Sequence, residues 1–459
     1  MRLQALASKI LLLVVGVLFG IQVTFALKYS IDIPCNDTWS LFDPGRIQRA
    51  FDLGWLLGFH NEHRIFTTKL AAWILYRIND LNLVHLLAVG HLYFGAAVVV
   101  TLLLLRNLIK APLGWLAVFG TALLMTPLNW ENHVVPFHMQ FHASMFFSLL
   151  YLHLVFSVGD RNHWTWSRVL SAGFCGFLGA FSFAGGVIQM IAAFGVLLIT
   201  VGSSAGWRAP KVPKTAWGLI VLTFSVIALY FVGYQKPGHH PDPILPLSLQ
   251  FWRFYAELLS LGFGLREISV ERSTMVLFIS HAPAVFLLVK TRFLTKANSD
   301  ERKIIAAWAG LVLIIASVAS ARSGFGLVQA KQVRYAEWGL FCVPMTIGLW
   351  LLCLRNLPIR LLGLSALRLK NAVAFGLLVF LSLTFWDEWS FTGAYVNWRN
   401  LMIRGQDCVV EYYRNPDKYQ SLECPYLDSG NLVPNLNHGK TRNFSFYRSA
   451  MKRVRAEAK

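Results

Sequence analysis

Residues 83–105 read LVHLLAVGHLYFGAAVVVTLLLL, a stretch that contains no Lys, Arg, Asp or Glu. An α-helix rises 1.5 Å per residue, so about 20 consecutive apolar residues cross the hydrocarbon core of a bilayer. The stretch therefore predicts a transmembrane helix, and it decides the fold class that the rest of the chain has to fit.

The composition of the whole chain agrees with a membrane protein. Of 459 residues, 56% are hydrophobic and 14% are charged, whereas soluble domains carry roughly 25% charged residues. Similar apolar runs recur along the sequence and predict an all-α, polytopic transmembrane protein with about eleven spans. We place the spans at 10–27, 83–105, 112–128, 142–158, 169–183, 185–202, 215–234, 273–289, 304–320, 338–354 and 371–386. The stretch 169–202 is either a tight hairpin that turns at SFAGG or one long broken element.

The distribution of charge orients these spans. Loops on the N-terminal side hold 18 Lys and Arg in 67 residues, and the opposite loops hold 13 in 123. The positive-inside rule then places the N-terminus in the cytoplasm and the C-terminus outside, in a periplasm or lumen. We expect a transmembrane domain over 1–386 and a small periplasmic tail over 387–459. The first span is a retained signal anchor or, alternatively, a cleaved signal peptide.

The net charge of +19 fits loops that contact anionic lipid head groups, and no basic stripe with interleaved aromatic residues predicts nucleic-acid binding. Twenty of the 23 Asp and Glu residues fall in segments predicted to lie outside. Chemistry that uses carboxylates is therefore expected on the outer side of the membrane.

The first outer loop, 28–82, contains two stretches in which apolar and polar residues alternate at helical spacing. They are 45–59 (GRIQRAFDLGWLLGF) and 64–80 (RIFTTKLAAWILYRIND), and both predict amphipathic helices lying in the membrane interface. Asp37 precedes them, and HNEHR at 60–64 separates them. Solvated loop acids and a local salt-bridged turn are the plainer interpretations. We nevertheless take Asp37 and Glu62 as candidate catalytic acids, with three neighbours as substrate-binding candidates: His60, His63 and Arg64.

Two further outer loops carry candidate residues. Loop 129–141 begins NWENHVVPFHMQ and contributes Glu131 and His138, which we expect to bind substrate. Pro136 interrupts the histidine spacing, so a metal site is not favoured. Loop 321–337 contributes Arg322, Lys331 and Arg334, three cations suited to a lipid phosphate. The plainer interpretation of these cations is ordinary contact with phospholipid. In the tail, the spacing of Cys408 and Cys424 allows a disulfide in an oxidising compartment.

The layout resembles the GT-C superfamily of membrane glycosyltransferases, and within it the bacterial O-antigen-modifying glucosyltransferases. The resemblance rests on the early loop acid, on HNEHR and on RSGFGLVQAKQVRY at 322–335. It implies a polyprenyl-phosphate-sugar donor and a glycan acceptor such as lipopolysaccharide O-antigen, with the active site facing the periplasm of a bacterial inner membrane. It also implies that a sugar is transferred, and we expect this sugar to be glucose. The transfer is expected to invert the configuration at the anomeric carbon.

The resemblance assigns roles to individual residues. Asp37 matches the general base, and Arg322, Lys331, Arg334 and Tyr335 match the part of the pattern expected to hold the donor phosphate. The superfamily often has two adjacent acids where this chain has Asn36-Asp37. A divalent metal is therefore not favoured, no cofactor is expected, and Glu62 or Glu131 remains open as a second acid.

Other functions fit the sequence in part. A transporter or flippase for lipid-linked glycans would need charged residues inside the spans, and the predicted spans contain none. An O-antigen polymerase or ligase would use an Arg-rich outer loop. A membrane O-acyltransferase would use a histidine but take its donor from the cytoplasmic side.

Overall fold

The structure is a computed structural model of the chain. It describes residues 2–42, 46–109, 128–156, 165–205, 214–238, 240–265, 269–356, 392–419 and 432–457, together with the single positions 120, 123, 124, 126, 424 and 427. The predicted span 371–386 lies outside the described residues, as does most of the predicted span 112–128.

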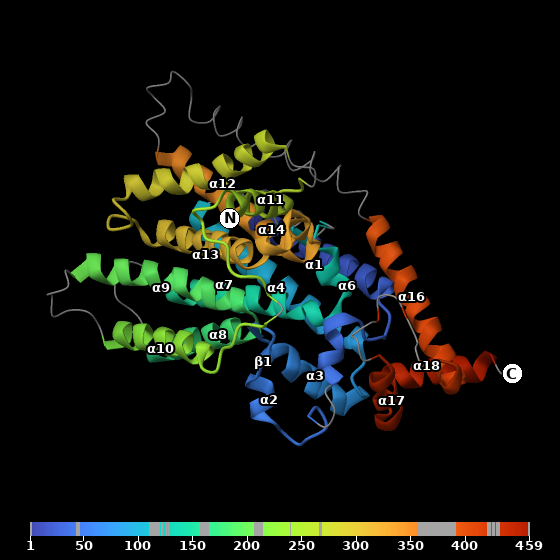
Figure 1. Cartoon of the computed structure of the whole chain (residues 1–459). Helices are drawn as coiled ribbons and strands as arrows, with labels where there is room; N and C mark the ends of the chain where they lie inside the picture. Colours follow the sequence, from blue (N-terminus) through green and yellow to red (C-terminus); the bar gives the residue numbers. More distant parts are fainter. Residues whose placement is uncertain are drawn as a thin grey trace.

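Long helices packed side by side form most of the molecule (Figure 1). They are α1 (Arg2–Tyr29), α4 (Leu83–Ile109), α7 (Met139–Phe156), α8 (Trp166–Ser182), α9 (Ala184–Ala205), α10 (Lys214–Phe231), α12 (Val270–Lys290), α13 (Ser299–Arg322) and α14 (Ala336–Asn356). Among the described residues, seven helical segments are long and apolar enough to cross a membrane. They are Leu83–Arg106, Pro136–Phe156, Ala184–Gly202, Lys214–Phe231, Val270–Lys290, Ser299–Phe325 and Val333–Leu354. These correspond to seven of the predicted spans, so the all-α membrane class is confirmed.

Two other predicted spans fall on helices of different character. The stretch 10–27 lies in α1, whose segment Leu13–Tyr29 is a shorter apolar helix. The stretch 169–183 lies in α8, which is 17 residues long. Phe183 is extended between α8 and α9, so residues 169–202 form a helical hairpin, the first of the two predicted alternatives.

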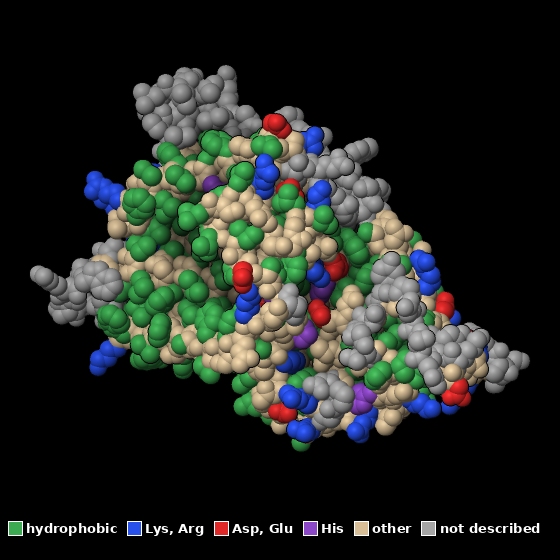
Figure 2. All heavy atoms as spheres, viewed as in Figure 1, with side chains coloured by type: hydrophobic (Ala, Val, Ile, Leu, Met, Phe, Trp, Pro, Cys, Tyr) green, Lys and Arg blue, Asp and Glu red, His purple; other side chains and the backbone are tan. Residues whose placement is uncertain are grey.

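Shorter elements gather at one end of the bundle (Figure 1). They come from segments far apart in the chain, and they include a two-stranded antiparallel sheet. They are η1 (Asn36–Phe42), α2 (Leu53–Leu57), β1 (Phe59–His60), β2 (His63–Arg64), α3 (Phe66–Asn79), α6 (Trp130–Val134), η2 (Pro136–His138), α11 (Leu249–Gly262), η3 (Ser323–Phe325), η4 (Leu327–Lys331) and η5 (Val333–Tyr335). The space-filling view shows hydrophobic side chains along the flank of the bundle and charged side chains over this end (Figure 2).

Of the two helices predicted in the first loop, one is present over most of its stretch and the other is much shorter than predicted. Helix α3 covers the second stretch, but the first stretch is helical only over Leu53–Leu57. The Asp52 side chain accepts a hydrogen bond from the Trp55 amide and so begins α2 there. Gly58 ends the helix in an extended conformation, and a Cβ at this position would lie only 2.9 Å from the Gly54 carbonyl oxygen. Apolar periodicity alone did not reveal these two boundaries.

The C-terminal segment packs against the first loop. It comprises α16 (Thr392–Arg414), η8 (Pro416–Tyr419), α17 (Leu432–Arg442) and α18 (Ser445–Glu457). Phe42 packs edge-on against Phe444 at 4.8 Å between ring centroids, and the Trp39 indole donates to the Leu427 carbonyl at 2.7 Å. Cys408 and Cys424 form a disulfide. The first loop and this segment therefore share one hydrophobic core, separate from the core of the bundle.

Candidate functional site

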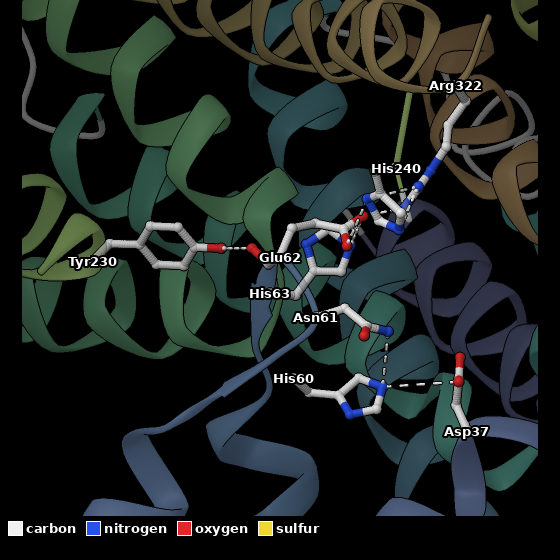
Figure 3. A network of polar contacts seen from close by, with 8 residues as sticks. All are labelled: Asp37, His60, Asn61, Glu62, His63, Tyr230, His240 and Arg322. Carbon is white, nitrogen blue, oxygen red and sulfur yellow. Dashed lines mark hydrogen bonds and ion pairs between the residues drawn. The ribbon is translucent and has the colours of Figure 1, made fainter. Parts of the chain in front are cut away.

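The segment HNEHR folds as a tight hairpin. His60 pairs with His63 across β1 and β2, and Asn61 at the turn has φ of 50°. Asparagine tolerates this left-handed conformation better than most residues. The hairpin projects Glu62 toward the end of α13, where Arg322 is the last residue (Figure 3).

Glu62 lies at the centre of a polar cluster (Figure 3). Its carboxylate forms an ion pair with Arg322, and it lies 3.3 Å from Nε2 of His63 and 3.4 Å from Nδ1 of His240. Burial raises the pKa of Glu62, but the His63 hydrogen bond, the His63 charge and Arg322 together outweigh burial and lower it to about 2. Glu62 is therefore held as a carboxylate and anchors the hairpin to α13 and to the loop that contains His240.

Asp37 lies in η1, beside the hairpin, and its side chain is 58% exposed. Its Oδ1 is 3.9 Å from Nε2 of His60 (Figure 3). The His60 ring packs against Phe137 of η2 at 4.9 Å between centroids. Burial lowers the pKa of His60, and Asp37 partly opposes that effect. Asp37 is thus an accessible carboxylate beside a histidine that burial favours in its neutral form.

A second carboxylate and guanidinium meet nearby. Oε1 of Glu131 lies 4.0 Å from the Arg334 guanidinium. Burial raises the pKa of Glu131, and Arg334 opposes the rise without cancelling it. A cavity of about 480 Å³ opens beside this pair, lined by Trp130, Glu131, Leu261, Lys331, Gln332, Val333 and Ala394. The cavity thus has a carboxylate, an amide, a cation and an indole on its walls.

The three predicted phosphate-binding cations do not form a single cluster. Arg322 pairs with Glu62 and contacts His240, Arg334 pairs with Glu131, and Lys331 lines the cavity. Tyr335 is buried, and its ring lies 5.4 Å from the Arg334 guanidinium carbon. The sequence showed no acid among these cations, and the structure supplies the acids from the two other loops.

Arg64 lies away from the cavity and is buried. Its guanidinium donates to the carbonyl oxygens of Tyr230, at 2.9 Å, and of Leu57 and Val232. It also stacks over the Phe59 ring at 4.0 Å. These contacts tie the hairpin to the end of α10, which is a scaffold position rather than an open substrate contact.

His138 is also buried, and its ring packs against Phe141 at 5.4 Å. Near His138 lies a polar network that the sequence did not predict. His142 contacts Glu337 at 2.9 Å, and Asn132 contacts Glu337 at 2.8 Å. The only signals in the sequence were a histidine and a glutamate near the ends of two predicted spans. Within the described ranges, no three His, Cys, Asp or Glu residues are grouped as metal ligands.

No known family model matches the chain, and no curated protein matches its sequence.

Proposed function

We propose that this protein is an integral membrane glycosyltransferase that moves a sugar, with glucose the first to test, from a polyprenyl-phosphate donor to a hydroxyl of a periplasmic glycan such as lipopolysaccharide O-antigen. One observation carries the proposal. Carboxylates and cations from separate loops meet at one end of a membrane-type helical bundle, beside a cavity of about 480 Å³ that Glu131 and Lys331 line.

The chemistry of these groups suits sugar transfer. An accessible carboxylate, Asp37, takes the proton from the acceptor hydroxyl as its oxygen attacks the anomeric carbon. The bond from that carbon to the phosphate oxygen breaks, and polyprenyl phosphate leaves with its electron pair. Arg334 and Lys331 stabilise the charge that develops on the phosphate. A single displacement inverts the configuration of the sugar.

The division between the two ion pairs supports separate roles. Glu62 is locked by Arg322 and two histidines, so we assign the Glu62–Arg322 pair to holding the hairpin in place. Glu131 lines the cavity, and its pKa is raised by burial. Carboxyl groups that lie in clefts and have a shifted pKa are candidates for functional residues. Glu131 is therefore the second acid that we place next to the substrate.

The proposed sidedness has independent support. The Cys408–Cys424 disulfide belongs to the segment that packs on the first loop, and disulfides persist in oxidising compartments. The positive-inside distribution of Lys and Arg places the same loops outside. A periplasmic active site of a bacterial inner-membrane protein fits both features.

A flippase for lipid-linked glycans is the second candidate. It is favoured by titratable side chains inside the bundle, where His91, His142 and Glu337 are buried. Such residues within membrane spans often mark a transport path. A flippase would move the lipid without forming a glycosidic bond, so product analysis separates the two functions.

The test is mass spectrometry of cell-surface glycan from cells with and without the protein, followed by transfer with purified protein in nanodiscs. The purified reaction uses polyprenyl-phosphate glucose and the isolated glycan. We expect one added hexose per modified repeat, with the anomeric configuration opposite to that of the donor. Identical glycan masses in both cells, with no hexose transferred in the purified reaction, would refute the proposal.

A further inference from the structure

Three buried residues lie directly behind the Glu131–Arg334 pair. Asn132 follows Glu131 in α6, Glu337 lies in the first turn of α14, and His142 lies in α7. Their side chains are 1%, 0% and 1% exposed, respectively. A polar group buried this completely is costly unless it is hydrogen-bonded, so the contacts among these residues constrain their positions strongly.

Hydrogen bonds link all three residues, while Oδ1 of Asn132 is buried without a hydrogen-bond partner among the described residues. The Asn132 amide nitrogen donates to Oε2 of Glu337 at 2.8 Å and to the Arg334 carbonyl at 3.0 Å. Nδ1 of His142 lies 2.9 Å from Oε1 of Glu337, and its Nε2 lies 3.2 Å from the Asn132 carbonyl. The network thus joins the residue next to Glu131 to the backbone of Arg334.

The partners determine the number of protons. The Asn132 carbonyl can only accept, so Nε2 of His142 carries a proton. The His142–Glu337 contact also needs one proton, located either on the imidazole or on the carboxyl group. The pair therefore has no net charge in either form. The ring of His142 lies 5.3 Å from that of His133 and 6.4 Å from that of His91, and neither histidine supplies a charge that would have to be balanced if it is neutral. Burial lowers the pKa of His133, which favours its neutral form.

We propose that Asn132, His142 and Glu337 are positioning residues that hold Glu131 and Arg334 beside the cavity through this hydrogen-bond network, in which His142 and Glu337 share one proton. Their effect on rate rests on the proposed glycosyl transfer, whereas the shared proton and the held geometry do not. A carboxylate and a phosphate-binding guanidinium act efficiently only when both are fixed, and a displacement of about 1 Å can cost about 100-fold in rate.

Three variants separate positioning from simple folding. Glu337→Gln keeps both contacts, since the amide oxygen accepts from Asn132 and the amide nitrogen donates to Nδ1 of neutral His142. Glu337→Ala removes both contacts. Asn132→Asp places an acceptor against two acceptors, Oε2 of Glu337 and the Arg334 carbonyl, at nearly unchanged volume.

The kinetic experiment measures kcat and KM in nanodiscs with polyprenyl-phosphate glucose. We expect Glu337→Ala and Asn132→Asp to lose about 100-fold in kcat with a smaller change in KM, and Glu337→Gln to retain most of the wild-type kcat. Wild-type kcat in folded Glu337→Ala and Asn132→Asp would overturn the proposal. A loss in Glu337→Gln equal to that in Glu337→Ala would also overturn it.

Two spectroscopic readings do not depend on activity. In ¹⁵N-histidine spectra, we expect Nε2 of His142 to carry a proton in the wild type and in Glu337→Gln, and Nδ1 to be an unprotonated acceptor in Glu337→Gln. In ¹³C-glutamate spectra, the titration midpoint of Glu131 should rise in Glu337→Ala as Arg334 moves away. An unprotonated Nε2 of His142 in the wild type, or an unchanged Glu131 midpoint in folded Glu337→Ala, refutes the inference. A wild type that transfers no sugar refutes only the proposed function.

Discussion

Glu62 and Arg322 form an ion pair although they are 260 positions apart in the chain. The side chain of each is 15% exposed, so the pair is largely shielded from water, and His63 and His240 contact the same carboxylate. The pair joins the hairpin of the first loop to the end of α13. It therefore fixes the hairpin beside the segment that follows α13, which carries Lys331 and Arg334.

The first prediction concerns the strength of this pair. A double-mutant cycle with Glu62→Gln and Arg322→Gln should give a coupling free energy of about 2 kcal/mol, between the values of exposed and fully buried pairs. The measurement is unfolding of the purified protein in detergent. The same cycle at Glu411 and Arg414, a more exposed pair within α16, should give a much smaller coupling. Equal couplings at the two sites would contradict the anchoring role of Glu62.

The second prediction is the pH dependence of that stability. The pKa of Glu62 falls from 4.5 to about 2 on folding, so the folded state favours its ionised form. This contribution to stability is complete above about pH 4.5 and is lost as the pH falls from there toward 2. Unfolding free energies of the wild type and Glu62→Gln should therefore converge in that window. A difference that stays constant down to pH 2 would show that Glu62 is not the responsible group.

The third prediction tests Asp37 as the general base. Asp37→Asn should lower sugar transfer by about 10² to 10⁴-fold, the range typical of general-base catalysis. Expression and the unfolding midpoint should not change, because Asp37 is exposed. The matched control is Asp242→Asn, whose carboxylate is 98% exposed and pairs with Lys236. Normal transfer by Asp37→Asn would move the role of base to another carboxylate, with Glu131 the first to examine.

The fourth prediction concerns Glu131, whose pKa is raised by burial. A raised pKa means that folding disfavours the ionised carboxyl, so its contribution to stability is present below about pH 4.5 and is lost as the pH rises through the folded value. Glu131→Gln should therefore be at least as stable as the wild type at pH 7. The same variant should lose sugar transfer, because Glu131 lines the cavity.

The control for Glu131→Gln is the pH profile of the wild type. Its transfer rate should fall on acidification through a midpoint above 4.5, the ordinary pKa of a glutamate. An acid limb at or below 4.5 would exclude Glu131 as the group that must be ionised.

The sequence predicted the helices better than the partners of polar residues. Runs such as 83–105 gave spans with nearly correct boundaries, because uninterrupted apolar stretches leave few alternatives. Helix α2 came out much shorter than predicted, because the Asp52 cap and Gly58 set its length. Single capping residues of this kind are difficult to weigh against periodicity.

Partners of side chains depend on contacts that no local pattern contains. Arg64 sits in a polar segment and looks like a substrate contact, yet carbonyl oxygens at the end of α10 take up its guanidinium. Glu337 lies one position before the predicted span 338–354, yet it is fully buried against His142. In both cases the deciding neighbour is more than 160 positions away, so only the fold could identify it.

The last prediction is the side of the membrane on which the site lies. Asp242 is exposed at the end of the bundle that holds Glu62 and Arg322, and Lys296 is exposed in the loop between α12 and α13 that is predicted to face the cytoplasm. Cells carrying Asp242→Cys should react with a membrane-impermeant maleimide, and cells carrying Lys296→Cys should react only after the membrane is opened.

The native cysteines favour this experiment. Cys35, Cys175, Cys342 and Cys353 are buried, and Cys408 is bonded to Cys424, so we expect little background labelling of the wild type. Labelling of Lys296→Cys in intact cells, with Asp242→Cys protected, would place the site in the cytoplasm. The proposed acceptor is a periplasmic glycan, so a cytoplasmic site would separate the acceptor from the catalytic groups even if Asp37 and Glu131 proved essential.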